Sequence, residues 1–272
     1  SGTPGKIKLE INTCERSPMM PLAKRAVRVI QYRGSSRLDG IQEQTFAKRY
    51  AISHEEVVRF AMAIIPQEEA PDGAIHRKAV SFPEVAVSEL TANMMARQAL
   101  DQRGMSPMVE VFDGRIEFSN AGAPLVEVVR IIDTVPQSRN EAMAGFMHKC
   151  GICEERGSGY DKIVTATSSS GLPAPRVGQQ QGRFTRATIF SKVLLDLTGK
   201  EDRVRTCYME VCLASVTAEA LANADVRELF GLPADAKVKA SHVIRDALER
   251  GLIKPVDPDT APRYMRYVPL WA

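Results

Sequence analysis

The chain has 272 residues, of which 44% are hydrophobic and 25% charged, an ordinary composition for a soluble globular protein that is long enough for two domains. Its net charge of +3, from 36 Lys and Arg against 33 Asp and Glu, is too small to identify a nucleic-acid binder by itself. No run approaches the roughly 18 apolar residues of a membrane span, and no signal segment opens the chain, so we expect a cytoplasmic protein without membrane contact.

The cysteines agree with a reducing compartment. Their number, five, is odd, and their spacing is not that of a small disulfide-rich scaffold. Cys150 and Cys153 have redox or zinc spacing, but no second pair lies at zinc-finger distance, so buried or half-buried structural thiols are predicted. The first five residues read like the remainder of a cloning vector. We therefore expect residues 1–25 to be an N-terminal extension or the remnant of an upstream domain.

The first regular elements are predicted from β-branched residues and a capping pattern. The stretch AVRVIQY, residues 26–32, is typical of a strand. Ser53 and Glu56 form a capping box ahead of VVRFAMAII, which predicts a helix that continues to Pro66.

A longer helix and a hairpin come next along the chain. Pro83 is suited to a helix start, and the helical pattern runs to about Ala99. Its predicted buried face consists of Val85, Val87, Leu90, Met94 and Met95. The alternating runs MVEVF and RIEFS are separated by Asp113-Gly114, a strong hairpin signal.

The middle of the chain is rich in turns. A turn is predicted over residues 120–124, a helix over 140–149, and a glycine-rich turn over 156–159 that leads into a short helix ending before Gly171. Residues 179–182 look like a linker. The next segment, RATIFSKVLLDL, predicts one or two final strands.

The last seventy residues predict three helices and two extended runs. Asn223 can cap the second helix, while Gly231 and Gly251 can end the second and the third. The extended runs surround a proline and aspartate turn, so the arrangement is that of a winged helix. Its candidate DNA contacts are Lys237, Lys239, Ser241, His242 and Arg245 of the third helix, with Arg263 from the wing. Winged helices also dock proteins or dimerise, and the sequence leaves both uses open.

The candidate chemistry depends on one helix and on the glycine-rich turn downstream of it. Glu89 and Asn93 are four residues apart, which places both on one helix face, where they could hold a hydrated Mg²⁺ ion and a water. On any amphipathic helix, however, such a pair is more commonly just two exposed polar residues without a ligand. The glycine-rich turn adds specificity, because glycines at a helix N-terminus let backbone N–H groups approach a phosphate.

The segments FPEVAVSELTANMMARQ, DGRIEFSNAGAPL, RNEAMAGFMHKCGICEERGSGYDKIV and RYVPLW are similar to the ATP-binding C-terminal region of RecG-like transcriptional regulators, which often carry a Schlafen-like DNA-binding domain upstream. The resemblance covers roughly residues 27–272. It implies an α+β fold, with a GHKL (Bergerat-type) two-layer α/β sandwich over residues 26–200 and a winged-helix domain over 201–272.

The resemblance also implies site residues. Asn93 would bind Mg²⁺, and Glu89 would orient or deprotonate the attacking water. The first glycine box, near adenine, would comprise Asn120 to Gly122, and the second, facing phosphate, Gly157, Ser158 and Gly159. Arg139 and Asn140 head the helix between the two boxes and complete the predicted set.

Two of these positions depart from the family pattern. Arg97 stands where the family often has histidine, and it could pair with phosphate or mark a decayed site. Asn120 replaces the aspartate that accepts a hydrogen bond from adenine, and an amide accepts more weakly than a carboxylate.

The predicted function is an ATP- and Mg²⁺-binding transcriptional regulator in which a lid between Leu125 and Arg156 biases DNA binding or homodimerisation. The alternative is a scaffold or dimerisation module whose nucleotide pocket has decayed. Whether ATP is hydrolysed stays open. A helicase motor is rejected because the G-x-x-x-x-G-K-[ST] loop is missing from the sequence.

Overall fold

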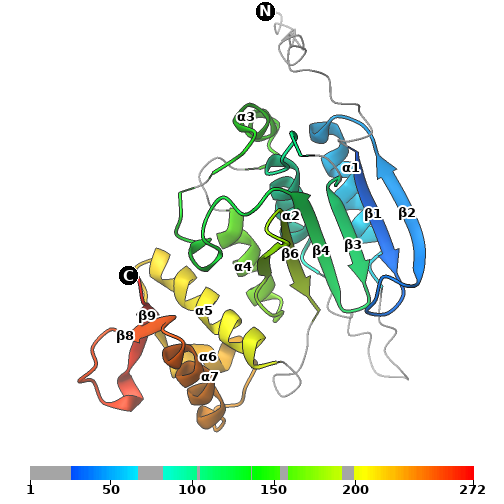
Figure 1. Ribbon diagram of the computed structural model, residues 1–272. Coiled ribbons are helices and arrows are strands. Elements are labelled where there is room, and N and C mark those ends of the chain that lie inside the picture. Colours follow the sequence, from blue (N-terminus) through cyan, green and yellow to red (C-terminus); the bar gives the residue numbers. More distant parts are fainter. Residues whose placement is uncertain (1–25, 67–81, 103–104, 136, 154–158, 192–198) are drawn as a thin grey trace, which may run out of the picture.

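The computed structural model of the chain describes residues 26–66, 82–102, 105–135, 137–153, 159–191 and 199–272 (Figure 1). The predicted N-terminal extension, residues 1–25, lies outside these ranges, as do Gly157 and Ser158. The described residues form a mixed α+β structure with a six-stranded sheet and a smaller three-stranded sheet.

The six-stranded sheet has the order β2-β1-β3-β4-β6-β5. All neighbouring strands are antiparallel except β1 and β3, which are parallel. The predicted hairpin is confirmed, with Phe112 paired to Arg115 across Asp113-Gly114. The strands are β1 (Val27–Tyr32), β2 (Gly40–Phe46), β3 (Met108–Phe112), β4 (Arg115–Ala121), β5 (Arg176–Gln180) and β6 (Phe184–Phe190).

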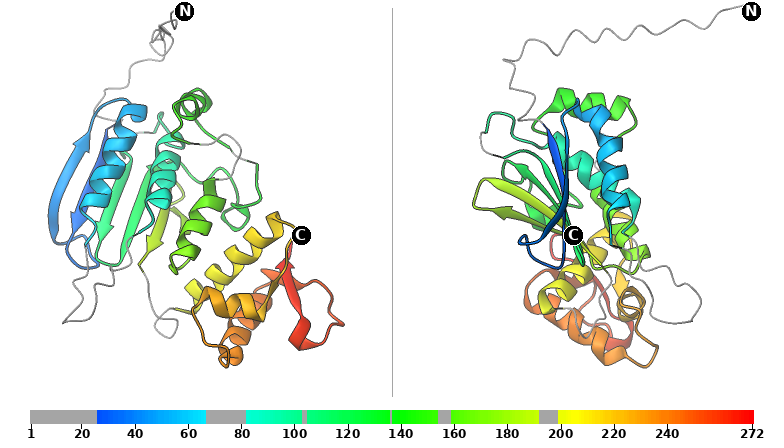
Figure 2. Two further views of the ribbon diagram at one scale, coloured as in Figure 1. Left: turned by 180° about the vertical axis from the view of Figure 1, so that it is seen from behind. Right: turned by 90° about the vertical axis from the view of Figure 1, so that its right-hand side faces the viewer.

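Three helices cover one face of this sheet: α1 (Tyr50–Ala63), α2 (Glu84–Ala96) and α4 (Gly159–Ser169) (Figure 2). Alternate residues of the strands, such as Val109, Ile116 and Ile189, point to that face and are fully buried, because side chains alternate across a strand. The opposite face carries no described helix, and we call it the open face. It bears polar and charged residues from the same strands.

The connection from β4 to α4 contains a short 3-10 helix, η3 (Val128–Arg130), and α3 (Glu141–Lys149). It corresponds to most of the predicted lid. Residues 154–158, which precede α4, are outside the described ranges.

The C-terminal part contains the three helices and the two extended runs that the sequence predicts. The helices are α5 (Lys200–Val216), α6 (Asn223–Leu229) and α7 (Lys237–Glu249), with a 3-10 turn η5 (Pro262–Tyr264). Gly231 and Gly251 follow α6 and α7 with φ of +60° and +64°, the left-handed conformation expected of helix ends. The strands β8 (Ile253–Pro255) and β9 (Arg266–Pro269) pair with a third, unpredicted strand, β7 (Leu221–Ala222), in the order β7-β9-β8.

Two predicted helix caps are wrong. Helix α1 begins at Tyr50, so Ser53 lies inside it, and its hydroxyl donates to the carbonyl of Lys48 at 3.1 Å instead of capping a helix start. Asn223 is the first residue of α6 and makes no cap bond. Its amide instead donates to Ser241 on α7 at 3.0 Å, and Asp225 satisfies the backbone N–H of Ala222 at 2.8 Å.

Other departures concern exposure and strand content. Val85 is 51% exposed, because α2 turns this position away from the sheet, whereas the other four predicted apolar positions are buried. The predicted linker at residues 179–182 is the end of β5 and the turn into β6. Strand β2 was not predicted, since almost all its residues are exposed and lack apolar alternation. Cys150 is exposed, contrary to expectation.

No helix of the described residues is both long and apolar enough to span a membrane.

Candidate nucleotide-binding site

The N-terminus of α4 lies directly against the polar face of α2. A Cβ added to Gly159, the first residue of α4, would lie 3.3 Å from Oε2 of Glu89 and 3.7 Å from Nδ2 of Asn93. A distance of 3.3 Å is tight for a Cβ contact, so a side chain at position 159 would push the Glu89 carboxylate aside by a few tenths of an ångström. The structure thus brings together Glu89, Asn93 and Gly159, three of the predicted site residues.

The side chain of Asn93 has an unsatisfied hydrogen-bond donor. Its Nδ2 atom is buried and has no hydrogen-bond partner among the described residues. Buried polar groups are almost always paired, because leaving one unpaired costs about 1–3 kcal/mol. An unpaired amide beside a helix N-terminus is therefore a position where an anionic ligand can supply the missing acceptor.

The first turn of α4 carries two charged residues, of which Lys162 contacts Glu89. Lys162 lies with its Nζ 3.5 Å from Oε1 of Glu89, whose side chain is only 12% exposed. Asp161 has a buried Oδ1 atom without a partner among the described residues, and burial raises the pKa of its carboxyl group. Sequence reasoning missed both residues. The feature of the sequence that could have pointed to them is their position immediately after the glycine-rich turn.

The C-terminal end of α2 meets the first residues of α4 and the end of β4. The guanidinium carbon of Arg97 lies 5.6 Å from the centre of the Tyr160 ring, and burial raises the pKa of that phenol. Asn120 is 4% exposed, and its amide donates to the backbone carbonyl of Arg97 at 3.2 Å. Arg97 and Asn120 are thus neighbours through the Arg97 backbone.

The other predicted positions hold the backbone around the first glycine box. Gly122 has a φ of +102°, and a Cβ added there would lie 2.5 Å from Nε of Arg139. Arg139 donates to the carbonyl of Ala123 at 2.6 Å. The Asn140 amide donates to the carbonyls of Ala96 and Gln98, at 3.1 and 2.8 Å, so it satisfies the end of α2.

The residues present fit a phosphate-bearing ligand better than a metal alone. No group of three or more His, Cys, Asp or Glu side chains that could hold a metal occurs in the described ranges. Magnesium, however, is commonly held by one or two protein oxygens together with substrate phosphates. The Asn93 amide could supply such an oxygen when a nucleotide brings the phosphates.

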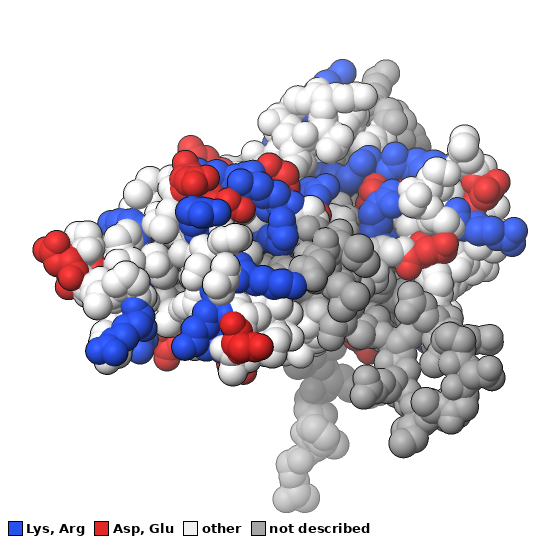
Figure 3. All heavy atoms as spheres, turned by 90° about the horizontal axis from the view of Figure 1, so that it is seen from below, with Lys and Arg blue, Asp and Glu red and all other residues white. Residues whose placement is uncertain are grey.

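The predicted DNA contacts lie on the solvent face of α7. Lys237, Lys239, Ser241, His242 and Arg245 are all exposed, whereas Ala240, Val243, Ile244 and Ala247 are buried against the rest of the module. Arg263 is exposed on η5, with its guanidinium carbon 4.5 Å from the centre of the Tyr264 ring. On the underside of the molecule, Lys and Arg lie in several groups with Asp and Glu among them, so the positive charge is local (Figure 3).

A comparison with known families matches a stretch of the chain around this site. A family model described as "Putative ATP-dependent DNA helicase recG C-terminal" matches residues 104–189, which is less than half of the chain. The match includes Asn120, Gly122, Arg139, Asn140 and Gly159, but α2 with Glu89 and Asn93 lies before it. No curated protein matches the chain.

Among solved structures, the chain is similar to the crystal structure of the DIP2311 protein from Corynebacterium diphtheriae. The TM-score is 0.55 at 11% sequence identity, over 91% of this chain and 59% of that one. At this identity the likeness concerns the fold alone, and the chain spans about three fifths of the other protein. The similarity of residues 104–189 to the RecG C-terminal region rests on the family match alone.

Proposed function

We propose that this chain binds ATP with Mg²⁺ between α2 and α4 and acts as a transcriptional regulator of the RecG-like kind, downstream of a Schlafen-like DNA-binding domain. In this proposal the sheet and its helices are a GHKL-type domain, and the C-terminal module is a winged helix. The observation that carries the proposal is the buried, unpaired Asn93 amide beside Gly159 at the start of α4. A phosphate oxygen at that position would satisfy the amide and face the positive end of the helix.

A physical route from this site to the C-terminal module supports regulation. The Tyr208 hydroxyl on α5 donates to the carbonyl of Val129 in η3 at 2.7 Å and accepts from Trp271 at 3.2 Å. Arg130 lies 5.1 Å from the centre of the Trp271 ring. The segment between the two glycine boxes is therefore bonded to the module, and a nucleotide that moves this segment would disturb these contacts.

The exposed face of α7 supports DNA as the partner. Lys237, Lys239 and Arg245 can contact phosphates, and Ser241 and His242 can donate to phosphates or base edges. The same face could serve homodimerisation, and the test of DNA binding below distinguishes this use from DNA contact.

The test of nucleotide binding is isothermal titration with AMPPNP and Mg²⁺. Asn93→Ala removes no hydrogen bond that the structure shows, so the variant is expected to fold with unchanged or higher stability. We expect at least about tenfold weaker AMPPNP binding, which corresponds to about 1.4 kcal/mol. Gly159→Ala, which forces the Glu89 carboxylate aside, is expected to weaken binding as well.

The matched control is Glu84→Ala, an exposed carboxylate on the same helix. Unchanged AMPPNP affinity in Asn93→Ala would refute the site. Hydrolysis is a separate matter. If the chain turns ATP over, Glu89→Gln should abolish turnover while AMPPNP still binds, because only the general base is removed.

The test of DNA binding is fluorescence anisotropy with a labelled duplex at several salt concentrations. The double variant Lys237→Glu, Lys239→Glu is expected to bind about tenfold more weakly and to show a smaller salt dependence, because fewer counterions are released. The control is Lys149→Glu on α3, which makes the same lysine-to-glutamate change at a position remote from α7 in sequence. Equal loss in both proteins, or no DNA binding by the parent together with dimer formation, would contradict the role of α7 in DNA contact.

A second candidate function is a scaffold or dimerisation module without ATP. It is favoured by the positions of Arg139 and Arg97, whose guanidinium groups pack against Gly122 and Tyr160 at the two ends of the predicted site. If these side chains fill the pocket, no nucleotide will raise the melting temperature of the parent protein. Arg139→Ala, which removes one of the two blocking side chains, would then be expected to restore some rise in melting temperature with nucleotide.

A further inference from the structure

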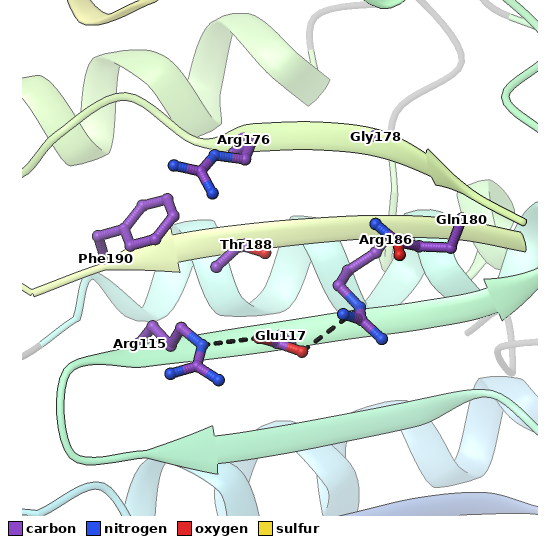
Figure 4. Close-up of a pocket in the computed structure, with 8 residues that line it drawn as sticks. All are labelled: Arg115, Glu117, Arg176, Gly178, Gln180, Arg186, Thr188 and Phe190. Atoms are coloured by element: carbon purple, nitrogen blue, oxygen red, sulfur yellow. Dashed lines mark hydrogen bonds and ion pairs between the residues drawn. The ribbon is translucent and has the colours of Figure 1, made fainter. Parts of the chain in front are cut away.

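The open face of the sheet contains a pocket that is separate from the α2–α4 site. It has a volume of about 130 Å³ and is built by outward-facing residues of three strands (Figure 4). Register pairs Arg176 with Thr188 and Gly178 with Arg186, so these side chains emerge next to one another on this face. Its lining residues are Arg115 and Glu117 of β4, Arg176, Gly178 and Gln180 of β5, and Arg186, Thr188 and Phe190 of β6.

A single carboxylate in the pocket is shared by several arginines. Glu117, with a side chain 8% exposed, accepts from Nε of Arg115 at 2.6 Å and from Nη2 of Arg37 at 2.8 Å. Nε of Arg186 lies 3.3 Å from the same carboxylate, on its other side (Figure 4). Arg37 also binds both oxygens of the buried Glu110, at 2.5 and 2.8 Å.

The arginines of the pocket retain unused donors. Arg186 bonds only through Nε, to Glu117 and Ser119, which leaves both of its terminal nitrogens without a partner in the described part of the chain. Arg176 bonds only through Nη2, to Asp202 at 2.5 Å. Arg115 bonds through Nε and Nη1, the latter to the carbonyl of Ser35 at 3.1 Å, and keeps Nη2.

The local charge is positive. Two separate ion-pair groups reach the pocket, one around Glu110 and Glu117 and one around Asp202. Together they contain five arginines and three carboxylates, so each group has one uncompensated positive charge. The arginines are residues 37, 115, 176, 186 and 205, and the carboxylates are residues 110, 117 and 202. Guanidinium groups match the geometry of phosphate oxygens, and their paired donors bind such oxygens two at a time.

We propose that this pocket is an anion site that binds a phosphate group through Arg115, Arg176 and Arg186. A phosphate carries up to two negative charges, which matches the summed excess charge of the two ion-pair groups. Thr188 and Gln180 supply additional hydrogen-bonding groups in the pocket. The phosphate could belong to a nucleic-acid backbone or to a small phosphorylated molecule.

The variant Gly178→Val tests the pocket without disturbing its charges. Gly178 lines the pocket, and a Cβ added to it meets no atom within 4 Å, so the strand can accept the larger residue. The valine methyl groups would occupy the space that the phosphate needs. The matched control is Gly40→Val on β2, where an added Cβ also meets nothing.

Pyrophosphate without Mg²⁺ is titrated calorimetrically into the Asn93→Ala protein, in which binding at the α2–α4 site is weakened. We expect one site in this protein and in its Gly40→Val derivative, and at least about tenfold weaker binding in its Gly178→Val derivative. In the otherwise unaltered chain, Gly178→Val should leave AMPPNP binding at the α2–α4 site intact. The proposal for the pocket and the proposal for the α2–α4 site can therefore be refuted independently. Pyrophosphate that binds equally to the Gly178→Val derivative, or to none of the proteins, would overturn the proposal.

A second titration identifies the source of the phosphate. A short single-stranded oligothymidylate that binds more tightly than pyrophosphate, with an affinity lowered by Gly178→Val and by salt, would assign the site to a nucleic-acid backbone. Pyrophosphate binding with an oligonucleotide response that is the same in Gly178→Val would assign it to a small phosphorylated ligand. Both results support the anion site itself.

Discussion

Three buried or half-buried asparagines of the predicted site differ in whether their side-chain amides have hydrogen-bond partners. Asn93 has an amide nitrogen that no described residue satisfies, while Asn120 and Asn140 have amides that bond backbone carbonyls. The three asparagines were predicted to act together in nucleotide binding. In the structure, Asn93 is the one of the three with an unsatisfied donor, so it is the clearest target for mutation.

His54 should make stability depend on pH. It is 7% exposed on α1, and its Nε2 lies 3.1 Å from the carbonyl of Ser88 on α2. Burial lowers the pKa of His54 below 6.5, so the unfolded chain takes up a proton before the folded protein does. The stability contributed by the neutral imidazole is therefore complete above about pH 6.5 and is lost as the pH falls through the folded-state pKa.

We expect the free energy of unfolding, measured in urea at pH 7.5 and 5.5, to fall less in His54→Gln than in the parent. The difference should not exceed about 1.4 kcal/mol per pH unit for one proton. The pH response must be compared between the parent and His54→Gln, because other groups also titrate. Burial raises the pKa of Asp161 and Glu210, and their protonation favours the folded state. The same pH response in both proteins would contradict the assignment to His54.

At the scale of elements, α2 is held by its C-terminal end. The carbonyl of Ala96 accepts from both Ser138 and Asn140, at 3.3 and 3.1 Å, and the carbonyl of Gln98 accepts from Asn140. The Gln98 side chain in turn accepts from the backbone of Ala121 at 2.9 Å. These bonds connect α2 to the end of β4 and to the start of α3.

Asn140→Ala should therefore act mainly on stability. It leaves two carbonyls at the end of α2 with fewer partners, so we expect a loss of about 1–2 kcal/mol in the free energy of unfolding by urea. Glu141→Ala, at the neighbouring exposed position, is the control and should change little. A loss of AMPPNP binding at unchanged stability would instead make Asn140 a direct ligand contact.

At the scale of the whole molecule, the segment between the glycine boxes lies between two parts of the structure. The segment begins after Gly122 and contains Arg139, which packs against Gly122 at the candidate site. Within η3, the Val129 carbonyl accepts from Tyr208, and Arg130 lies over Trp271 of the C-terminal part. Helix α5 also contacts α4 directly. The C-terminal module is thus attached to the elements that a nucleotide would contact.

Trp271 is the single tryptophan of the chain, so its fluorescence reports on this junction. We expect AMPPNP with Mg²⁺ to change its emission in the parent and not in Asn93→Ala. Tyr208→Phe removes the hydroxyl that bonds Val129 and Trp271, so it should shift the emission of the free protein and reduce the response to nucleotide. Saturating AMPPNP without any emission change would show that the site and the module are not coupled through Trp271.

Patterns that depend on near neighbours in sequence were sufficient for most elements. Alternation around Asp113-Gly114 predicted β3 and β4, and the glycines after α6 and α7 predicted their ends. These signals succeed because hairpin and helix-end conformations are determined within a few residues. The spacing of Glu89 and Asn93 likewise placed both on one face of α2.

What only the tertiary structure decided is which distant residues meet. That Gly159 packs on α2, and that Asn140 rather than solvent satisfies the end of that helix, depends on how α4 and α3 return to the sheet. The strand order places β6 between β4 and β5, which brings Arg115, Arg176 and Arg186 into one pocket. Residues so far apart in the sequence have no local signal for such contacts, because strand order and helix packing are set by burial of the whole core.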